Sequence, residues 1–471
     1  MIELSLAQVE AFAGGKLLNA TDDLNAVTVT GSVETDSRLV GKGSLFVAKP
    51  GEVTDGHNFL QKAKDAGAVA AIVEREVTSV DLPQILVSDA VLALGKLAAE
   101  VLALVRAETG LKVIGITGSN GKTTTKNMLR AILSTAGETI APIESYNNEV
   151  GAPISVLKIS RSTKFLVAEL GAGGLGSIDY LANITKPDVA VELKVGLAHA
   201  GEFGGIETTA KIKAELLPHV SPTGVAIFNF DDGYVRAMAE NFNGSKLWFG
   251  TTSNASYWAD GYELSMAGTS FDLHLPDDSV RRVTLRILGE HHVMNALASI
   301  SVADYLGVPR ADIIAALEAL PLAERWRMQL TEGADGISYI NDAYNASPDS
   351  TKAALQTLAQ LGRQTGRRTV AIIGEMAELG EFSRQEHDAI GRLCVRLNLG
   401  LTIAIGEGAR LVYMGASLEG SYDGEAQFLE SLDGAFDVVR GMLRSGDIVL
   451  IKSSKSANLR HLGDQLAEAK A

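Results

Sequence analysis

A run of glycine, hydroxyl and lysine residues near position 120 has the composition of a phosphate-binding loop. The run is Gly118, Ser119, Asn120, Gly121, Lys122, Thr123 and Thr124, and it follows an apolar segment at 113–117. Glycines let backbone N–H groups turn inward around phosphate oxygens, and a helix that begins here adds its positive end. Lys122 would reach the β- and γ-phosphates, and the Thr123 hydroxyl would bind magnesium. The run therefore predicts an ATP site.

The loop departs from the strict phosphate-loop pattern at one position. That pattern has a glycine five residues before Gly121, where this chain has Ile116. A glycine turn without a ligand is the alternative interpretation. The order of apolar strand, Gly-Lys-Thr and helix favours phosphate binding, because each part stands where that chemistry needs it.

Lys213 lies on a stripe of a predicted helix that is otherwise apolar. The positions at helical spacing are Ile206, Ala210, Lys213 and Leu217. Burial favours the neutral amine, and a neutral amine can take up carbon dioxide to become a carbamate. A carbamate acts as a new carboxylate, able to bind magnesium or to orient the γ-phosphate. The alternative is that Lys213 extends along the domain edge into water. Lys211, about 160° further round the helix, is expected on the surface.

Glu169 ends an apolar segment that begins at Phe165. In open α/β sheets, ligands bind outside the carboxyl ends of the strands. A carboxylate there can hold a magnesium ion that bridges ATP phosphates. A solvated carboxylate in a surface loop is the alternative, and the nearby phosphate loop favours the metal role.

The elements that must position these residues follow from the hydrophobic rhythm of the chain. Short strands with a helix between them occupy residues 1–88. After a predicted helix at 89–106, strands alternate with helices as in a parallel sheet covered on both faces. This alternation restarts near residue 321 as a second doubly wound unit. We predict an α/β protein of three domains: a small α/β domain at 1–88, a central parallel-sheet domain with the phosphate loop at 89–320, and a Rossmann-like domain at 321–471.

Composition narrows the class of protein. A chain of 471 residues with 46% hydrophobic and 21% charged residues is long enough for about three folded domains. The net charge of −15 argues against nonspecific binding to nucleic acid or to an acidic membrane. The N-terminus lacks a basic signal-peptide region, and no apolar run reaches the roughly 18 residues that span a bilayer. With Cys394 alone, an intrachain disulfide is excluded. We expect a cytoplasmic monomer without stable membrane insertion.

The order of several short blocks, together with the phosphate loop, resembles the Mur ligases over essentially the whole chain. Within that family the likeness is to members that add D-alanyl-D-alanine to a UDP-muramoyl-tripeptide. The blocks are Thr35-Asp36-Ser37-Arg38, Phe46, Asp55-Gly56-His57, Asn147-Asn148-Glu149, Glu169, His199, Lys213, Asn295, Arg327, residues 341–350, residues 374–380, His387 and residues 452–456. One position departs from the family, which usually has His-Asn where this chain has His291-His292.

The resemblance implies roles for these blocks. The first domain would bind the UDP-sugar peptide through Ser37, Arg38, Gly56 and His57, with Asn147 and Asn148 also at the substrate. Asn295 would bond adenine, and Arg327, Asp342 and Asn345 would reach phosphates and ribose. The loop with Glu375, Met376, Glu378 and Leu379 would bind the incoming dipeptide. The alternatives are helix capping for Asn295, turn formation for 342–345, and a plain strand-to-helix connection at 375–380.

The resemblance also implies two magnesium ions and a reaction. Thr123, Glu169, His199 and a carbamylated Lys213 would be the metal ligands, although a single histidine is more often structural. Lys122, Glu169, His199 and Lys213 would be the catalytic group for ATP-dependent amide formation through an acyl phosphate. The rivals are an earlier Mur ligase, a folylpolyglutamate synthetase and a nucleotide-binding regulatory protein. The blocks at 342–349 and 375–380 argue against the two ligases, and the metal set argues against the regulatory protein.

Overall fold

The computed structural model describes residues 1–18, 27–51, 54–142, 146–197, 200–321, 324–420 and 425–469. The chain divides into two compact units. The first consists of Met1–Thr117, Leu133–Val191 and Ala214–Ala226, and the second of Gly118–Ile132, Glu192–Lys213 and Ile227–Ala471. Across the described ranges, no helix combines the length and the apolar character needed to cross a membrane.

The first unit begins with a five-stranded sheet of order β2-β7-β6-β5-β4. Strands β4 to β7 run parallel, and β2 joins antiparallel to β7. Every residue of β5 (Leu45–Ala48) and β6 (Ala70–Val73) is buried, as expected for strands covered on both faces. The other elements here are β1 (Leu4–Ser5), α1 (Leu6–Ala13), β2 (Lys16–Leu18), β3 (Thr28–Val29), β4 (Val33–Glu34), η1 (Gly56–Phe59), α2 (Leu60–Asp65) and β7 (Gln84–Leu86).

Helix α3 (Ala90–Thr109) follows this sheet and confirms the helix predicted from apolar spacing. Asp89 caps it, because its carboxylate accepts the N–H groups of Val91 and Leu92 at 2.8 Å. Gly110 ends it in a left-handed conformation. The buried side of α3 belongs to the hydrophobic core of the first unit.

A nine-stranded sheet has the order β16-β15-β14-β13-β12-β11-β8-β10-β9. Strand β10 (Thr163–Glu169) lies between β8 (Lys112–Thr117) and β9 (Glu138–Ile140), parallel to both. The predicted parallel pairing is therefore present here, but it does not extend to the opposite edge of the sheet, where β14 (Tyr257–Ser265), β15 (Gly268–His274) and β16 (Val280–Leu285) pair antiparallel. Along β15, buried and partly exposed residues alternate from Thr269 on, which is the pattern typical of antiparallel strands with one face toward solvent.

The remaining elements between residues 112 and 320 connect these strands. They are α4 (Lys122–Leu133), α5 (Gly151–Val156), α6 (Ser177–Thr185), β11 (Val189–Glu192), α7 (Ala200–Phe203), α8 (Ile206–Ala214), η2 (Leu217–His219), β12 (Val225–Asn229), α9 (Gly233–Glu240), β13 (Ser245–Gly250), α10 (His291–Tyr305) and α11 (Arg310–Ala319).

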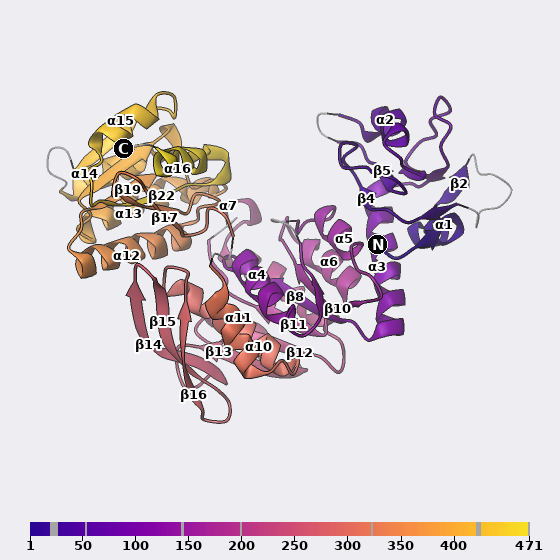
Figure 1. Ribbon diagram of the computed structural model, residues 1–471, viewed down its shortest axis with the longest axis horizontal. Coiled ribbons are helices and arrows are strands. Elements are labelled where there is room, and N and C mark those ends of the chain that lie inside the picture. Colours follow the sequence, from indigo (N-terminus) through magenta and orange to yellow (C-terminus); the bar gives the residue numbers. More distant parts are fainter. Residues whose placement is uncertain are drawn as a thin grey trace. The chain divides into compact units, whose positions relative to one another are not determined.

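The last part of the second unit is a six-stranded sheet of order β17-β18-β22-β19-β20-β21, with helices packed around it (Figure 1). Strands β18 to β22 pair parallel, and β17 joins antiparallel. Along β19 (Thr369–Ile373), Val370 and Ile372 join one apolar core and Ala371 and Ile373 the other. The sheet is therefore covered on both faces, as the Rossmann-like prediction requires.

The other elements of this part also alternate as predicted. They are β17 (Gln329–Glu332), β18 (Ser338–Asn341), α12 (Pro348–Thr365), η3 (Gly380–Phe382), α13 (Ser383–Arg396), β20 (Leu401–Ile405), η4 (Glu407–Ala409), α14 (Arg410–Glu419), β21 (Ala426–Leu429), α15 (Ala435–Met442), β22 (Ile448–Lys452), η5 (Lys455–Ala457) and α16 (Leu459–Glu468). The α/β class is confirmed, while the domain boundaries after residues 88 and 320 stay predictions.

Candidate active site

The predicted phosphate loop lies between the end of β8 and Lys122, the first residue of α4. Gly118 and Gly121 have φ angles of 149° and 90°, which glycine adopts without the strain of a side chain. A Cβ atom at Gly121 would lie 2.3 Å from Asn295 Oδ1, so only glycine fits. Lys122 Nζ donates to the Gly118 carbonyl oxygen at 2.7 Å, which keeps its positive charge over the loop.

Ser119 attaches this loop to the segment that follows β11. Its backbone N–H donates to the Lys194 carbonyl at 2.7 Å. The Gly196 N–H donates to Ser119 Oγ at 2.9 Å. Ser119 Oγ also donates to the Gly196 carbonyl at 3.2 Å, so three hydrogen bonds of Ser119 join the loop to this segment.

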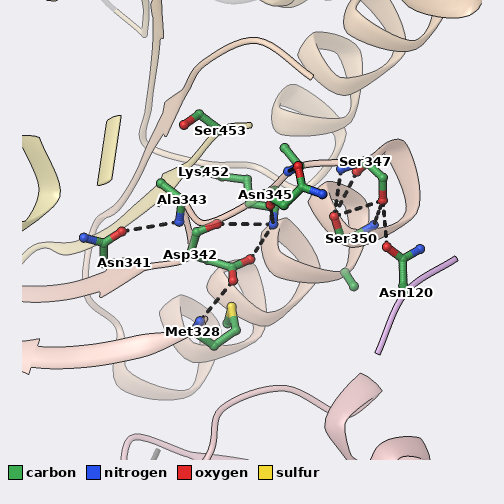
Figure 2. Close-up of polar contacts among 12 residues, drawn as sticks. Asn120, Met328, Asn341, Asp342, Ala343, Asn345, Ser347, Ser350, Lys452 and Ser453 are labelled. Carbon is green, nitrogen blue, oxygen red and sulfur yellow. Dashed lines mark hydrogen bonds and ion pairs between the residues drawn. The ribbon is translucent and has the colours of Figure 1, made fainter. Parts of the chain in front are cut away.

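Three buried nitrogen atoms around the loop have no hydrogen-bond partner in the described part of the chain: Asn120 Nδ2, Arg327 Nε and His292 Nε2. Asn120 is anchored by its oxygen, which accepts from Ser347 Oγ at 3.1 Å (Figure 2). Arg327 Nη2 donates to Thr123 Oγ1 at 3.3 Å. Buried nitrogens are normally paired, so this set fits a ligand rich in acceptors, such as the phosphates of a nucleotide.

Arg327, which contacts Thr123 at the end of the phosphate loop, lies in a strained turn. The residues on either side, Trp326 and Met328, have φ angles of 59° and 48°, which cost free energy in non-glycine residues. Their hydrogen bonds hold the turn: Met328 N–H donates to Asp342 Oδ1 at 3.0 Å, and Trp326 Nε1 donates to both carboxylate oxygens of Asp464. Such strain persists only where surrounding contacts impose it, which is common at ligand sites.

Asn295 lies inside α10 and not at its start, so the capping alternative is wrong. Its Oδ1 accepts from Thr125 Oγ1 at 3.4 Å. Its Nδ2 lies 3.4 Å from His292 Nδ1. Burial, and then the charge of the neighbouring His291, hold the pKa of His292 well below its usual value. His292 is therefore a neutral ring beside the predicted adenine contact, at the position where the family has asparagine.

Asp342 forms a buried ion pair with Lys452 at 2.7 Å (Figure 2). Lys452 Nζ also donates to the Asn345 carbonyl at 2.6 Å. Burial lowers the pKa of Lys452, and Asp342 opposes that shift. The contacts of Lys452 with Asp342 and with the Asn345 carbonyl therefore stabilise the turn at residues 342–345. This agrees with the turn-forming alternative for Asp342. Asn345 Oδ1 accepts the Ala346 N–H at 3.0 Å, which is also a local turn contact.

Glu169 ends β10 and is 1% exposed, so the solvated-loop alternative is wrong. Asn147 Nδ2 donates to Glu169 Oε1 at 2.8 Å, which brings two of the predicted residues together. Asn148 instead accepts the N–H groups of Val150 and Gly151, at the start of α5. Its side chain thus has a local structural contact, and its substrate role stays a prediction.

Lys213 is 3% exposed on α8, whereas Lys211 is exposed, as predicted from their spacing. The alternative in which Lys213 extends into water is wrong. Burial, and then the positive charge of Lys122, lower the pKa of the Lys213 amine to about 7, while Glu192 opposes the shift. A substantial share of the amine is therefore neutral near pH 7, which is the form that reacts with carbon dioxide.

Glu192, the last residue of β11, is a buried carboxyl that the sequence analysis missed. It is 1% exposed, and burial raises its pKa well above the usual value, although the charge of Lys213 opposes the shift; Asp232 adds to it to a smaller degree. The signal was a single acidic residue at the carboxyl end of an apolar strand, the same signal that pointed to Glu169.

The chain matches sequence models of three domains: "Mur ligase family, catalytic domain" at residues 30–101, "Mur ligase middle domain" at 116–303, and "Mur ligase, glutamate ligase domain" at 326–455. It is 40% identical to UDP-N-acetylmuramoyl-tripeptide–D-alanyl-D-alanine ligase of Mycobacterium tuberculosis (strain ATCC 25618 / H37Rv), over 99% of this chain and 98% of that protein. The chain belongs to the Mur ligase family.

Solved structures agree with this membership. MurF from Acinetobacter baumannii superposes with a TM-score of 0.90 at 32% identity, over 100% of both chains. MurF ligase from Thermotoga maritima, solved in complex with ADP, gives a TM-score of 0.80 at 28% identity, over 93% of this chain and 97% of that one. The three-domain α/β architecture of this Mur ligase is therefore confirmed.

The predicted metal ligands of this Mur ligase are only partly described by the structure. Thr123 is buried at the start of α4, and Glu169 is buried at the end of β10. His199 lies outside the described residues. Among the residues that are described, no three His, Cys, Asp or Glu side chains form a group that could hold a metal ion. A carbamate on Lys213 would add the oxygen ligands that magnesium prefers.

The residues predicted to bind the UDP-sugar differ in how far their polar groups are already engaged by other residues. Both ring nitrogens of His57 are engaged, Nδ1 with Asp55 Oδ1 at 2.6 Å and Nε2 with the N–H of Glu74 at 2.9 Å. Gly56 is packed so closely that a Cβ would lie 2.7 Å from the Lys49 carbonyl oxygen. These residues shape the domain itself. Arg38 is exposed and pairs with Asp36 at 2.6 Å, and Ser37 is buried beside it.

The loop predicted to bind the dipeptide divides into core and surface residues. Met376 and Leu379 are buried in a hydrophobic core, and the Met376 N–H donates to His387 Nε2 at 2.9 Å. The connector alternative therefore describes these two residues well. Glu375 and Glu378 are exposed, and Glu378 has a strained φ of 65°. Only these two carboxylates point to a ligand role.

Replacing Lys122 with alanine should abolish ligation, because the charge that develops on the phosphates loses the lysine ammonium expected beside it. The hydrophobic cores are unchanged, so the variant should still fold. ADP release should fall by at least about 100-fold. Lys211→Ala on the exposed face of α8 is the control and should stay active. Activity of Lys122→Ala within about tenfold of the unmodified enzyme would contradict the phosphate-loop assignment.

Replacing Asp342 with alanine should lower the free energy of unfolding by about 3–5 kcal/mol, because it leaves the Lys452 ammonium buried without a counter-charge. The double variant Asp342→Ala/Lys452→Met should recover most of that loss. Urea denaturation measures both. Asp36→Ala, which removes an exposed ion pair, is the control and should change stability little. If the single and double variants are equally unstable, the pair does not govern this turn.

Proposed function

We propose that this Mur ligase uses ATP to join D-alanyl-D-alanine to the terminal carboxylate of UDP-N-acetylmuramoyl-tripeptide, releasing ADP and phosphate in peptidoglycan precursor synthesis. The observation that carries the proposal is the 40% identity, over 99% of the chain, to a Mycobacterium tuberculosis protein with that printed activity. The phosphate loop and the unpaired nitrogens around it supply the nucleotide chemistry that this reaction needs.

The reaction proceeds in two balanced steps. An oxygen of the tripeptide carboxylate attacks the γ-phosphorus of ATP, the bond from that phosphorus to its bridging oxygen breaks, and ADP leaves. The first step leaves an acyl phosphate. The dipeptide amine then attacks its carbonyl carbon, phosphate leaves with the electron pair of the broken C–O bond, and the nitrogen releases a proton to solvent. Lys122 and the loop N–H groups hold the phosphates and offset their growing charge. Magnesium, when bound, neutralises phosphate charge further.

Lys213 serves this reaction as a carbamate. Its nitrogen attacks the carbon of carbon dioxide, an N–C bond forms, one C=O electron pair moves to oxygen, and a proton leaves the nitrogen for solvent. The buried position and the lowered pKa of the amine support this step. The resulting anion, with His199, would be a ligand set for a second magnesium ion, while Thr123 and Glu169 would hold the first.

Substrate contacts belong to the same proposal. Arg38 is exposed on the first domain and carries a positive charge that suits the diphosphate of the UDP-sugar, although its Nε and Nη2 already donate to Asp36. Both ring nitrogens of His57 are engaged within the domain. Glu375 and Glu378 suit the dipeptide ammonium, since both carboxylates are exposed. Asn147 contacts Glu169 directly, so its substrate role would be to hold that carboxylate in place. The monomeric state and the cytoplasmic location stay predictions.

The enzyme should release ADP with D-alanyl-D-alanine and not with free D-alanine, L-alanine or D-glutamate. An ADP-release assay with tripeptides ending in lysine and in diaminopimelate measures this and also identifies the third residue. If a single amino acid supports release as well as the dipeptide, the chain is a ligase of another Mur step.

Lys213→Ala should inactivate the enzyme without unfolding it, because the anion on α8 is lost while the surrounding core remains. Formate should restore part of the activity, since a small carboxylate can enter the space that the side chain leaves. Lys211→Ala should remain active and gain nothing from formate. A fully active Lys213→Ala enzyme would rule out the carbamate.

A further inference from the structure

The hydroxyl group of Ser347 belongs to two structures at once. Ser347 caps α12, because its Oγ accepts the Ser350 N–H at 3.3 Å and its own N–H donates to Ser350 Oγ at 3.0 Å. The same Oγ donates to Asn120 Oδ1 in the phosphate loop, at 3.1 Å (Figure 2). One hydroxyl group therefore joins the first turn of α12 to the loop.

The pattern of hydrogen bonds around Ser347 directs its proton to Asn120. The Ser350 hydroxyl donates to the Ser347 carbonyl oxygen at 3.1 Å. Ser350 Oγ also lies 3.1 Å from Ser347 Oγ, but that oxygen already accepts the Ser347 N–H. The Asn120 amide oxygen is thus the open acceptor for the Ser347 proton. Because the oxygen of this amide is held toward α12, its Nδ2 faces the other way.

A second contact keeps the start of α12 close to the loop. Asp349 lies in the first turn of α12, and a Cβ atom at Gly196 would be only 2.4 Å from its Oδ2. Asp349 Oδ1 lies 3.8 Å from Lys194 Nζ. Gly196 is itself hydrogen-bonded to Ser119 of the loop. The contact of Ser347 is therefore one of several that join α12 to the loop.

The orientation of the Asn120 amide has a chemical consequence. Among the described residues, the buried Asn120 Nδ2 has no hydrogen-bond partner. Phosphate oxygens accept hydrogen bonds and cannot donate them, and a donor that meets a charged acceptor makes a strong bond. With the amide reversed, an oxygen would face the phosphates and repel them. Only the orientation in the structure suits a nucleotide.

We propose that Ser347 is a positioning residue for ATP, whose hydroxyl group holds the Asn120 amide with Nδ2 directed to a phosphate oxygen. This inference rests on ATP binding at the phosphate loop, which the proposed function requires. Ser347 acts through Asn120 and has no contact of its own with the nucleotide. The donor is then in place before ATP arrives, so binding does not have to order it.

Substitutions at Ser347 separate the hydroxyl donor from the helix cap. Ser347→Gly removes the donor at little cost to α12, because glycine is well tolerated at an N-cap. Ser347→Ala removes the donor as well and is a second test if one variant folds poorly. Ser347→Thr keeps both the donor and the cap. Thermal melting of each full-length variant checks its folding.

Ser5→Gly is the matched control for the loss of a cap. Ser5 caps α1 with the same pair of contacts, because its N–H donates to Gln8 Oε1 at 3.0 Å and its Oγ accepts the Gln8 N–H at 3.3 Å. Ser5 belongs to the first compact unit, whereas the phosphate loop belongs to the second. Ser5→Gly should therefore bind ATP as the unmodified enzyme does.

Isothermal titration calorimetry with ATP and magnesium, without tripeptide, measures the effect. Ser347→Gly and Ser347→Ala should raise the dissociation constant of ATP about tenfold, as expected when one hydrogen bond to a charged acceptor is lost. Ser347→Thr should bind ATP as the unmodified enzyme does.

Asn120→Ala provides a measurement that a purely structural role of Ser347 would not change. Asn120→Ala should weaken ATP binding at least as much as Ser347→Gly. In the double variant, Ser347→Gly should cause no further loss, because no amide is left to orient.

The other outcomes overturn the inference. Losses that add in the double variant would show that Ser347 supports α12 and not the amide. A threonine variant as weak as the glycine variant would show that the hydroxyl donor is not what matters. Unchanged ATP affinity in Ser347→Gly and Ser347→Ala would show that the amide needs no such hold. These three results leave the proposed function standing, whereas an unmodified enzyme that fails to bind ATP would remove both.

Discussion

Several ionisable side chains in this protein are buried at the carboxyl ends of strands, where burying a charge costs free energy. Glu169 ends β10, Glu192 ends β11, and Lys452 ends β22. The carboxyl ends of parallel strands leave backbone groups and side chains directed toward a ligand, so charges collect there. Burying a charge without a partner costs free energy, so the partners of each buried group indicate whether it stabilises the fold or stays available for a ligand.

Lys452 and Glu192 show the two forms of compensation. Lys452 has Asp342 as a counter-charge and the Asn345 carbonyl as an acceptor, and both contacts stabilise the turn at residues 342–345. Glu192 and Lys213 attract each other but do not bond. A closed pair rigidifies the fold, because breaking it would strand a charge.

Strained backbone occurs in two segments that carry predicted ligand contacts. Trp326 and Met328, on either side of Arg327, adopt positive φ angles, as does Glu378 in the loop predicted for the dipeptide. The Trp326 and Met328 conformations are imposed by hydrogen bonds to Asp464 and Asp342, from residues far away in sequence. Hydrogen bonds to these two aspartates therefore maintain the unusual backbone on either side of Arg327, a candidate phosphate contact.

The sequence by itself determined the elements and the loop, because both depend on neighbours along the chain. Apolar spacing located α3 and the strands β18, β19, β20 and β22 of the last sheet, but not its strands β17 and β21. Glycine spacing located the phosphate loop with Lys122. It also placed Lys213 on a buried face and Lys211 on an exposed one. Only the tertiary structure decided which polar groups lack partners. Glu192 looks like any strand-end acid until its neighbours are known, and His57 looks available until Asp55 and the Glu74 N–H are found on its ring. Hydrogen-bond satisfaction depends on residues distant in sequence, and no local pattern encodes it.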